Sequence, residues 1–131
     1  MRDIFDIEIV FQDYAEVKTA DKWVKIISFG GSCNSKYFRG KVLPGGTDVQ
    51  VLESDGTGTV SARYILEGVD ESGASCKVYV CNEGVIDVNG KMRTKPQVHT
   101  DSELLIWLHQ SELNCRFETK GEIFHVIIYG E

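Results

Sequence analysis

Apolar side chains that alternate with polar ones, in short segments separated by glycine-rich turns, are the feature that most restricts how this sequence can fold. Between residues 4 and 12 every second position is apolar, in the order Phe5, Ile7, Ile9 and Phe11. Residues 59–67 repeat this arrangement with Val60, Ala62, Tyr64 and Leu66. A repeat of two residues is typical of a strand that buries one face. The sequence therefore predicts a strand in each of these segments.

Other segments rich in β-branched and aromatic residues end at clusters of Gly, Pro, Asp and Asn, which favour turns. We expect strands at residues 23–29, 37–43, 48–53, 77–82, 115–119 and 123–129, with 85–88 continuing the sheet. The residues around Pro96 are predicted to form a loop. Residues 104–108 fit either a short helix capped by Ser102 or another strand.

Short strands at this density, with almost no helical periodicity, indicate an all-β fold, either a sandwich or a barrel. Closure into a barrel removes exposed strand edges, so a single antiparallel β-barrel is the fold that we expect. The length of 131 residues fits one domain over residues 1–131.

The charge balance argues against a nucleic-acid-binding surface. Lys and Arg number 14 against 20 Asp and Glu, a formal net charge of −6, and the basic residues form no run. No stretch approaches the roughly eighteen uncharged apolar residues of a membrane helix. Charges at Arg2, Asp3 and Asp6 interrupt any secretion signal. We therefore expect a cytoplasmic protein without nucleic-acid or membrane partners.

The sequence offers no pattern that is typical of a metal or cofactor site. Cys76 and Cys81 have no His at zinc-finger spacing. A phosphate-binding loop, a dinucleotide fingerprint and a paired-His metal motif are all missing from the chain. We therefore expect no metal and no cofactor.

Residues 40–48, Gly-Lys-Val-Leu-Pro-Gly-Gly-Thr-Asp, are the densest candidate for a functional segment. Two glycines after a proline allow a tight turn or a close approach to a ligand. Asp48 has two interpretations: it stabilises the turn through backbone amides, or it acts as an acid or base.

Blocks of residues along the chain resemble those of a known family, domain of unknown function 3237, also called uncharacterised protein family 0311. The blocks are the segment 40–48, Ala-Arg-Tyr at 62–64, the turn at 70–74 followed by Asn-Glu-Gly at 82–84, and Arg-Thr-Lys-Pro at 93–96. One departure is Val49, where the family pattern has Trp. The resemblance implies a barrel similar to allene oxide cyclase, dirigent-like or calycin-like barrels, which hold small apolar molecules.

The polar positions that match the family's blocks are Asp48, Arg63, Tyr64, Asn82, Arg93 and Thr94, and we add His99 because its predicted loop position suits a functional group. Arg63 and Tyr64 lie on opposite faces of one strand, so at most one of them faces the barrel interior. Tyr64 could also be an ordinary core residue. Arg63 could bind a ligand carboxylate together with Arg93, or pair with Glu67 or a neighbouring strand.

Three functions are compatible with this sequence. The first is a barrel that binds an unidentified small apolar ligand with a carboxylate or carbonyl group. The second is a cofactor-independent isomerase, cyclase or lyase that uses an acid or base such as Asp48, Tyr64 or His99. The third is an assembly module, for example a homodimer, that acts through apolar outer-face residues such as Val10 and Tyr79. Whether the protein is an enzyme stays open at this point.

Overall fold

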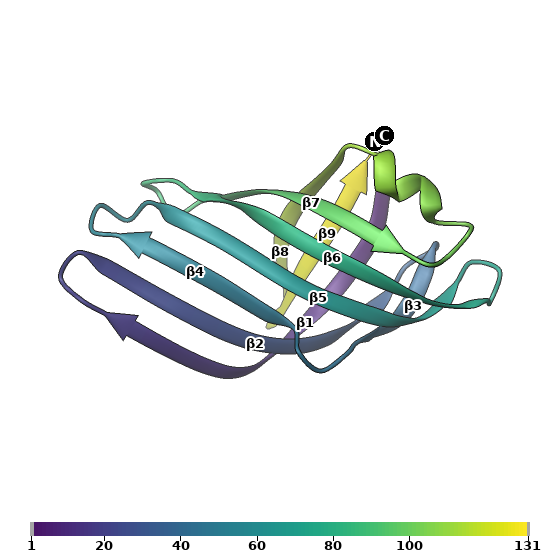
Figure 1. The fold of residues 1–131 in the computed structure, drawn as a ribbon, viewed down its shortest axis with the longest axis horizontal. Helices are drawn as coiled ribbons and strands as arrows, with labels where there is room; N and C mark the ends of the chain where they lie inside the picture. The colour runs from purple at the N-terminus through teal and green to yellow at the C-terminus, as the bar shows by residue number, and fades with distance from the viewer. Residues whose placement is uncertain (1, 131) are drawn as a thin grey trace.

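The computed structural model describes residues 2–130 and consists almost entirely of antiparallel strands that close into a barrel (Figure 1). The elements are β1 (Arg2–Lys18), β2 (Lys22–Asn34), β3 (Phe38–Val42), β4 (Thr47–Glu53), β5 (Gly58–Asp70), β6 (Ser75–Ile86), β7 (Met92–Thr100), the 3-10 helix η1 (Ile106–Gln110), β8 (Leu113–Lys120) and β9 (Ile123–Gly130). The all-β barrel predicted from alternation is confirmed.

The strands follow the order β7-β6-β5-β3-β2-β1-β9-β8, and β4 also pairs with both β2 and β5. The long strands β2 and β5 therefore contact β3 near one end and β4 near the other. At the two ends of this path β7 and β8 meet, where Lys95 Nζ donates a hydrogen bond to Asn114 Oδ1 at 2.7 Å. Within residues 2–130 no backbone ladder joins β7 to β8, so side chains close the barrel at this seam.

One end of the barrel is plugged by the segment between β7 and β8. Leu105 and Leu108 are buried in the main apolar core together with Phe5 and Phe38. Polar contacts hold this plug in place: Ser102 Oγ donates to Asp70 Oδ2 at 2.9 Å. The opposite end, where the β1–β2, β4–β5 and β6–β7 turns lie, is not covered by this segment (Figure 1).

The structure corrects the prediction of a loop around Pro96, because this residue lies inside β7. Inward positions of β7 are Thr94, Pro96, Val98 and Thr100, and only one of these is a strongly apolar strand former. The alternation was therefore hidden by polar buried residues. Proline is tolerated because β7 is at the end of the hydrogen-bonded path, where a missing backbone N–H breaks no outer ladder.

Several boundaries also differ from the prediction: β2 extends to Asn34, beyond residue 29, and β6 is one continuous strand from Ser75 to Ile86. The first strand continues to Lys18, well beyond residue 12, because residues 10–18 form a mostly exposed hairpin arm with β2 that has no buried face to show alternation. Of the two alternatives for residues 104–108, the short helix is the closer one, displaced to Ile106–Gln110. Ser102 does not cap it, since its hydroxyl bonds to Asp70.

Among the described residues no helix has the length and apolar character needed to cross a membrane.

Candidate functional site

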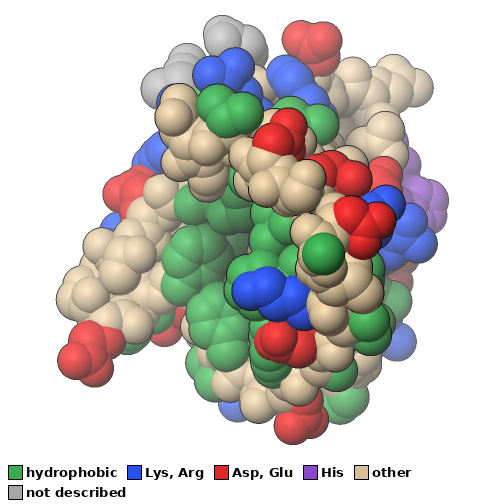
Figure 2. All heavy atoms as spheres, turned by 90° about the vertical axis from the view of Figure 1, so that its left-hand side faces the viewer, with side chains coloured by type: hydrophobic (Ala, Val, Ile, Leu, Met, Phe, Trp, Pro, Cys, Tyr) green, Lys and Arg blue, Asp and Glu red, His purple; other side chains and the backbone are tan. Residues whose placement is uncertain are grey.

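A cavity of about 150 Å³ lies inside the barrel near its unplugged end. Figure 2 looks onto this end and shows hydrophobic side chains recessed in a hollow. The residues that line the cavity are Ile9, Phe11, Ile27, Phe29, Asp48, Gln50, Val60, Ala62, Tyr64, Asn82, Met92, Thr94, Phe117, Phe124 and Val126. They come from every strand of the barrel except β3, so formation of the cavity depends on the whole fold.

Strand register places the polar lining residues in adjacent rows of the wall. Asp48 of β4 pairs with Ala62 of β5, which pairs with Asn82 of β6. In the next row towards the mouth, Gln50 is aligned through Val60 and Gly84 with Thr94 of β7. Side chains two residues apart on a strand share a face. The small Ala62 therefore leaves open space between the Asp48 and Asn82 side chains.

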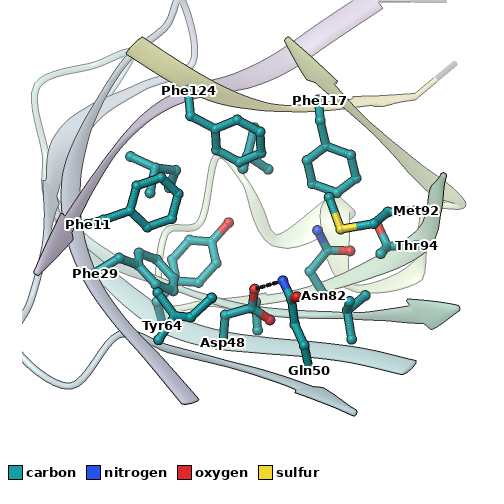
Figure 3. Close-up of a pocket in the computed structure, with 15 residues that line it drawn as sticks. Phe11, Phe29, Asp48, Gln50, Tyr64, Asn82, Met92, Thr94, Phe117 and Phe124 are labelled. Atoms are coloured by element: carbon teal, nitrogen blue, oxygen red, sulfur yellow. Dashed lines mark hydrogen bonds between the residues drawn. The ribbon is translucent and has the colours of Figure 1, made fainter. Parts of the chain in front are cut away.

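An aromatic wall faces these polar rows across the cavity (Figure 3). Phe117 and Phe124 stack with ring centroids 5.8 Å apart, and Phe11 lies 5.9 Å from Phe124. Phe29 meets Tyr64 edge to face at 5.2 Å. Phe11 is 59 % exposed although it lines the cavity, which places it at the mouth.

Four polar atoms of the cavity wall have no hydrogen-bond partner in the chain: Asp48 Oδ1, Tyr64 Oη, Asn82 Oδ1 and Thr94 Oγ1. Only one other buried side-chain atom within residues 2–130 shares this property, Trp23 Nε1. A buried polar group without a partner costs about 1–3 kcal/mol, so proteins rarely gather several in one place. Because all four line one apolar cavity, this cavity is the candidate functional site.

The Asp48 carboxyl is the charged group of this cavity when ionised. Burial raises its pKa above the usual value, although a hydrogen bond from Gln50 Nε2 to Oδ2 at 3.0 Å opposes part of the rise. The lining contains no Lys, Arg or His that could pair with it. Burial also raises the pKa of the Tyr64 hydroxyl, which is therefore a neutral hydrogen-bond donor.

Asn82 and Thr94 lie against β8. Asn82 Nδ2 donates to Cys115 Sγ at 3.4 Å, which leaves Oδ1 as the free acceptor. Burial raises the pKa of the Cys115 thiol, and the hydrogen bond from Asn82 opposes part of this rise. The thiol is thus a neutral neighbour behind the cavity wall.

The structure brings together four of the seven residues singled out in the sequence, Asp48, Tyr64, Asn82 and Thr94. The other three lie on the outer face, away from the cavity. Arg63 pairs with Glu83 of the neighbouring strand at 3.4 Å, and not with Glu67. Arg93 is exposed opposite Val85, four residue pairs along the ladder from the pair that Arg63 forms with Cys81. Such a separation does not favour one carboxylate site for both arginines.

His99 belongs to β7 rather than to a loop, and its exposed ring stacks on that of His109 with centroids 4.5 Å apart. His109 Nε2 accepts a hydrogen bond from the Thr100 backbone N–H at 2.8 Å. The pair therefore packs η1 against the outside of β7.

Sequence reasoning did not single out Gln50 or the aromatic residues Phe11, Phe117 and Phe124 as lining residues. The signal for Gln50 was its position two residues after Asp48, which puts both side chains on one face. Phe11 continued the alternation of Ile7 and Ile9. Nothing in the last hairpin distinguished a cavity wall from a filled core.

Residues 2–130 contain no cluster of three or more His, Cys, Asp or Glu side chains that could hold a metal ion.

The amino-acid sequence matches one known protein family. Residues 2–128 match a family described as "Protein of unknown function (DUF3237)". Over 62 residues the chain is 40 % identical to a UPF0311 protein of Clostridium acetobutylicum, a match that covers 47 % of this chain and only 35 % of that relative.

Two solved structures share the fold over nearly the whole chain. A protein of unknown function from Clostridium acetobutylicum has a TM-score of 0.80 at 24 % identity and covers 98 % of this chain and 94 % of its own. An enzyme from Penicillium herquei has a TM-score of 0.74 at 17 % identity and covers 98 % of this chain and 92 % of its own. At such identities the likeness shows the fold alone.

Proposed function

Because the chain belongs to the DUF3237 family, for which no function is given, we propose its function from the cavity itself: it binds a small, largely apolar, uncharged ligand. The observation that carries the proposal is the set of four unpartnered polar atoms on the wall of one apolar cavity. A ligand that supplies donors and acceptors to these atoms would remove the cost of leaving them unpaired.

The volume of the cavity limits the size of the ligand. An apolar cavity of about 150 Å³ is large enough for benzene, and the cavity described above has about this volume. A compound with one six-membered ring and a short polar substituent therefore fits the site. The stacked rings of Phe117 and Phe124 offer a flat apolar surface to it.

The charges of the cavity favour a carbonyl or hydroxyl group over a carboxylate. A buried anionic ligand needs a cationic partner, and the lining offers none while it contains Asp48. Arg63 and Arg93, the two arginines that could bind a carboxylate, are both exposed on the outer face. We therefore narrow the ligand class to neutral compounds.

Thermal-shift and ligand-observed NMR measurements with a library of neutral one-ring ketones, phenols and hydrocarbons would test this function, since a ligand of the native state raises the unfolding midpoint. Ala62→Leu fills the space between Asp48 and Asn82 and should abolish the shift. Arg93→Ala, on the outer face, is the matched control and should leave it unchanged. Equal effects of the two variants would contradict a site in the cavity.

A second candidate is a cofactor-independent isomerase, cyclase or lyase. Asp48 and Tyr64, two of the three acid or base candidates, line the same cavity, whereas His99 does not. A solved structure with this fold belongs to a protein described as an enzyme. Any compound that binds should therefore be followed by NMR for conversion, with Asp48→Asn and Tyr64→Phe as variants expected to lose it. A bound ligand that stays unchanged over days would argue for binding alone.

For assembly and location our proposals are a homodimer and the cytoplasm. Val10 and Tyr79 are exposed as expected, which supports a subunit contact on the outer face. The four cysteines are free, as in proteins of reducing compartments. Light scattering at high protein concentration tests the first proposal, and a strictly monomeric protein would refute it.

A further inference from the structure

Gln50 binds one oxygen of the Asp48 carboxyl and leaves the other without a partner. Its Nε2 donates to Oδ2 of Asp48, so Oδ2 acts as an acceptor. The other oxygen, Oδ1, is buried and has no partner. When the carboxyl binds a proton, the proton belongs on Oδ1, because Oδ2 already receives one from the amide. A protonated Asp48 therefore carries an O–H donor, in the wall of the cavity, that no group of the described chain accepts.

Tyr64 supplies a second donor beside it. Asp48 pairs with Ala62 across the ladder, and Tyr64 is the next residue of β5 on the same face. Figure 3 shows Tyr64 and Asp48 side by side in the cavity wall, with the Tyr64 hydroxyl pointing into the cavity. The edge-to-face contact with Phe29 fixes the ring of Tyr64, which is only 4 % exposed. Its hydroxyl has no partner in the chain.

We propose that the protonated carboxyl of Asp48 and the hydroxyl of Tyr64 donate hydrogen bonds together to one carbonyl oxygen of a neutral ligand. This inference rests on the proposed binding function and adds to it the chemical group that is recognised and the two donors that recognise it. Two neutral donors in an apolar site polarise a carbonyl and stabilise negative charge that develops on its oxygen. The site is thus built for ketones and related carbonyl compounds.

The surroundings of Asp48 favour the neutral carboxyl. β1, β2 and β9 direct only apolar side chains into the cavity, and β7 contributes Met92 and Thr94. The other titratable groups nearby are Tyr64 and, behind Asn82, Cys115 of β8. Burial raises the pKa of both, so neither carries charge when Asp48 titrates. A ligand that displaces water from the cavity adds to the desolvation of Asp48.

Proton uptake on binding follows directly. If the ligand binds the protonated form of Asp48, affinity falls as the pH rises above the pKa of this carboxyl in the free protein. The loss approaches tenfold per pH unit once Asp48 is fully ionised in the unbound state.

The test compares two probes of nearly equal shape, acetophenone and α-methylstyrene. The second probe has a C=CH2 group in place of the C=O group of the first. Isothermal titration on the full chain at pH 5 to 8 gives their affinities, and infrared spectroscopy gives the C=O stretch of bound acetophenone. When Asp48 is protonated, the wild type should bind acetophenone about tenfold more tightly than α-methylstyrene, since each neutral hydrogen bond contributes a few-fold. This preference should fall as the pH rises. The C=O band should move to lower frequency than in hexane.

Variants separate the two donors. Each of the single variants Asp48→Leu and Tyr64→Phe should lose most of the preference for acetophenone. In the double variant the loss of affinity should be smaller than the product of the two single losses, because both donors bind the same carbonyl oxygen. Asp48→Asn should keep the preference but lose the pH dependence, since Gln50 can orient the new amide so that its NH2 group faces the cavity. Arg63→Ala should change neither probe.

Two results would overturn this inference while leaving the binding function intact. One is an equal affinity for the two probes. The other is a C=O band that is not shifted in the wild type and does not change in Asp48→Leu and Tyr64→Phe. If neither probe binds, the proposed function fails and the inference fails with it. The frequency of the C=O band of bound acetophenone reports only on folded protein that holds the ligand. A variant of lower stability therefore still gives an interpretable frequency.

Discussion

Nδ1 of His125 lies 2.6 Å from Oδ1 of Asp6, and this contact joins β9 to β1 on the outer side of the barrel wall. The His125 side chain is only 8 % exposed. Lys120 Nζ contacts the second oxygen of the same carboxylate at 3.2 Å. Burial disfavours ionisation of Asp6, but the hydrogen bonds from His125 and Lys120 outweigh it and lower its pKa. The ionised carboxylate thus stabilises the fold.

Asp6→Asn should destabilise the protein by about 1 kcal/mol at pH 7, a value reduced for the partial exposure of the carboxylate. Because the pKa of Asp6 is lowered from 3.8, its contribution is present above that pH and is lost as the pH falls through the lowered value. Urea unfolding of the wild type and of Asp6→Asn at pH 7 and at pH 3 measures how much of this contribution is present at each pH. A difference between variant and wild type that persists unchanged at pH 3 would contradict this role.

Asp48 should show the opposite behaviour. Its pKa is raised in the fold, so the ionised form destabilises the native state above the raised value, whereas below 3.8 there is no such cost. Asp48→Asn should therefore raise the unfolding free energy at pH 7 by about 1 kcal/mol. The gain should vanish towards pH 3.5. Thermal unfolding across this range tests the sign, and a variant less stable than wild type at pH 7 would show that Asp48 has a stabilising partner.

Tyr64→Phe removes a buried hydroxyl that has no partner, so it should stabilise the ligand-free protein by about 1 kcal/mol. Tyr37→Phe is the matched control, because the Tyr37 hydroxyl accepts a hydrogen bond from Arg2 at 3.2 Å and its loss should bring no gain. Chemical denaturation gives the unfolding free energies of both variants and of the wild type, and their comparison tests this prediction. A gain at Tyr64 paired with weaker ligand binding is the trade between stability and function expected of a binding residue.

Gly84→Ala should destabilise the barrel by about 3 kcal/mol or more. A Cβ at this position would lie 1.9 Å from the Arg93 carbonyl oxygen, so β7 would have to move and take Thr94 with it. Gly30→Ala is the control within another strand, where the added carbon meets only the flexible end of Gln12. Equal losses of stability in the two variants would show that β6 and β7 adjust more easily than the register implies.

Phe11→Ala should accelerate ligand exchange more than it weakens binding. Phe11 is largely exposed at the mouth and touches Phe124, so its removal widens the entrance while most of the wall stays intact. We expect the dissociation rate constant to rise several-fold, measured by NMR exchange or stopped-flow displacement. Val10→Ala, the neighbouring residue on the opposite face, is the control. An unchanged rate would place the entrance elsewhere.

How far the sequence predicts this structure depends on which signal each segment carries. Alternation correctly separated the two faces of residues 59–67, but only the structure shows that the face with Tyr64 is the inner one and that Arg63 lies outside. It failed for β7, where Thr94 and Pro96 occupy inward positions and resemble loop residues. It also ended the first strand too early, since the arm around Tyr14 is exposed on both faces.

The candidate site was predicted in part for a related reason. Resemblance to the family singled out Asp48, Asn82 and Thr94, but the sequence could not show that their side chains meet, because they are aligned only through strand register. The same resemblance included Arg63 and Arg93, which the pleat directs outward. The aromatic wall of Phe117 and Phe124 required the closed barrel, since β8 and β9 reach the cavity from the far end of the chain.

Backbone pairing of Arg2 with Gly130 brings both ends of the described chain to the plugged side of the barrel (Figure 1). There the guanidinium of Arg2 also lies over the ring of Trp107. The barrel is thus shaped like a cup, in which the plugged end is the base and the open end of the cavity is the rim. An affinity tag, a second domain or a sensor surface attached at either end would sit behind the base and leave the rim clear. Immobilised protein should therefore keep its full capacity for small molecules.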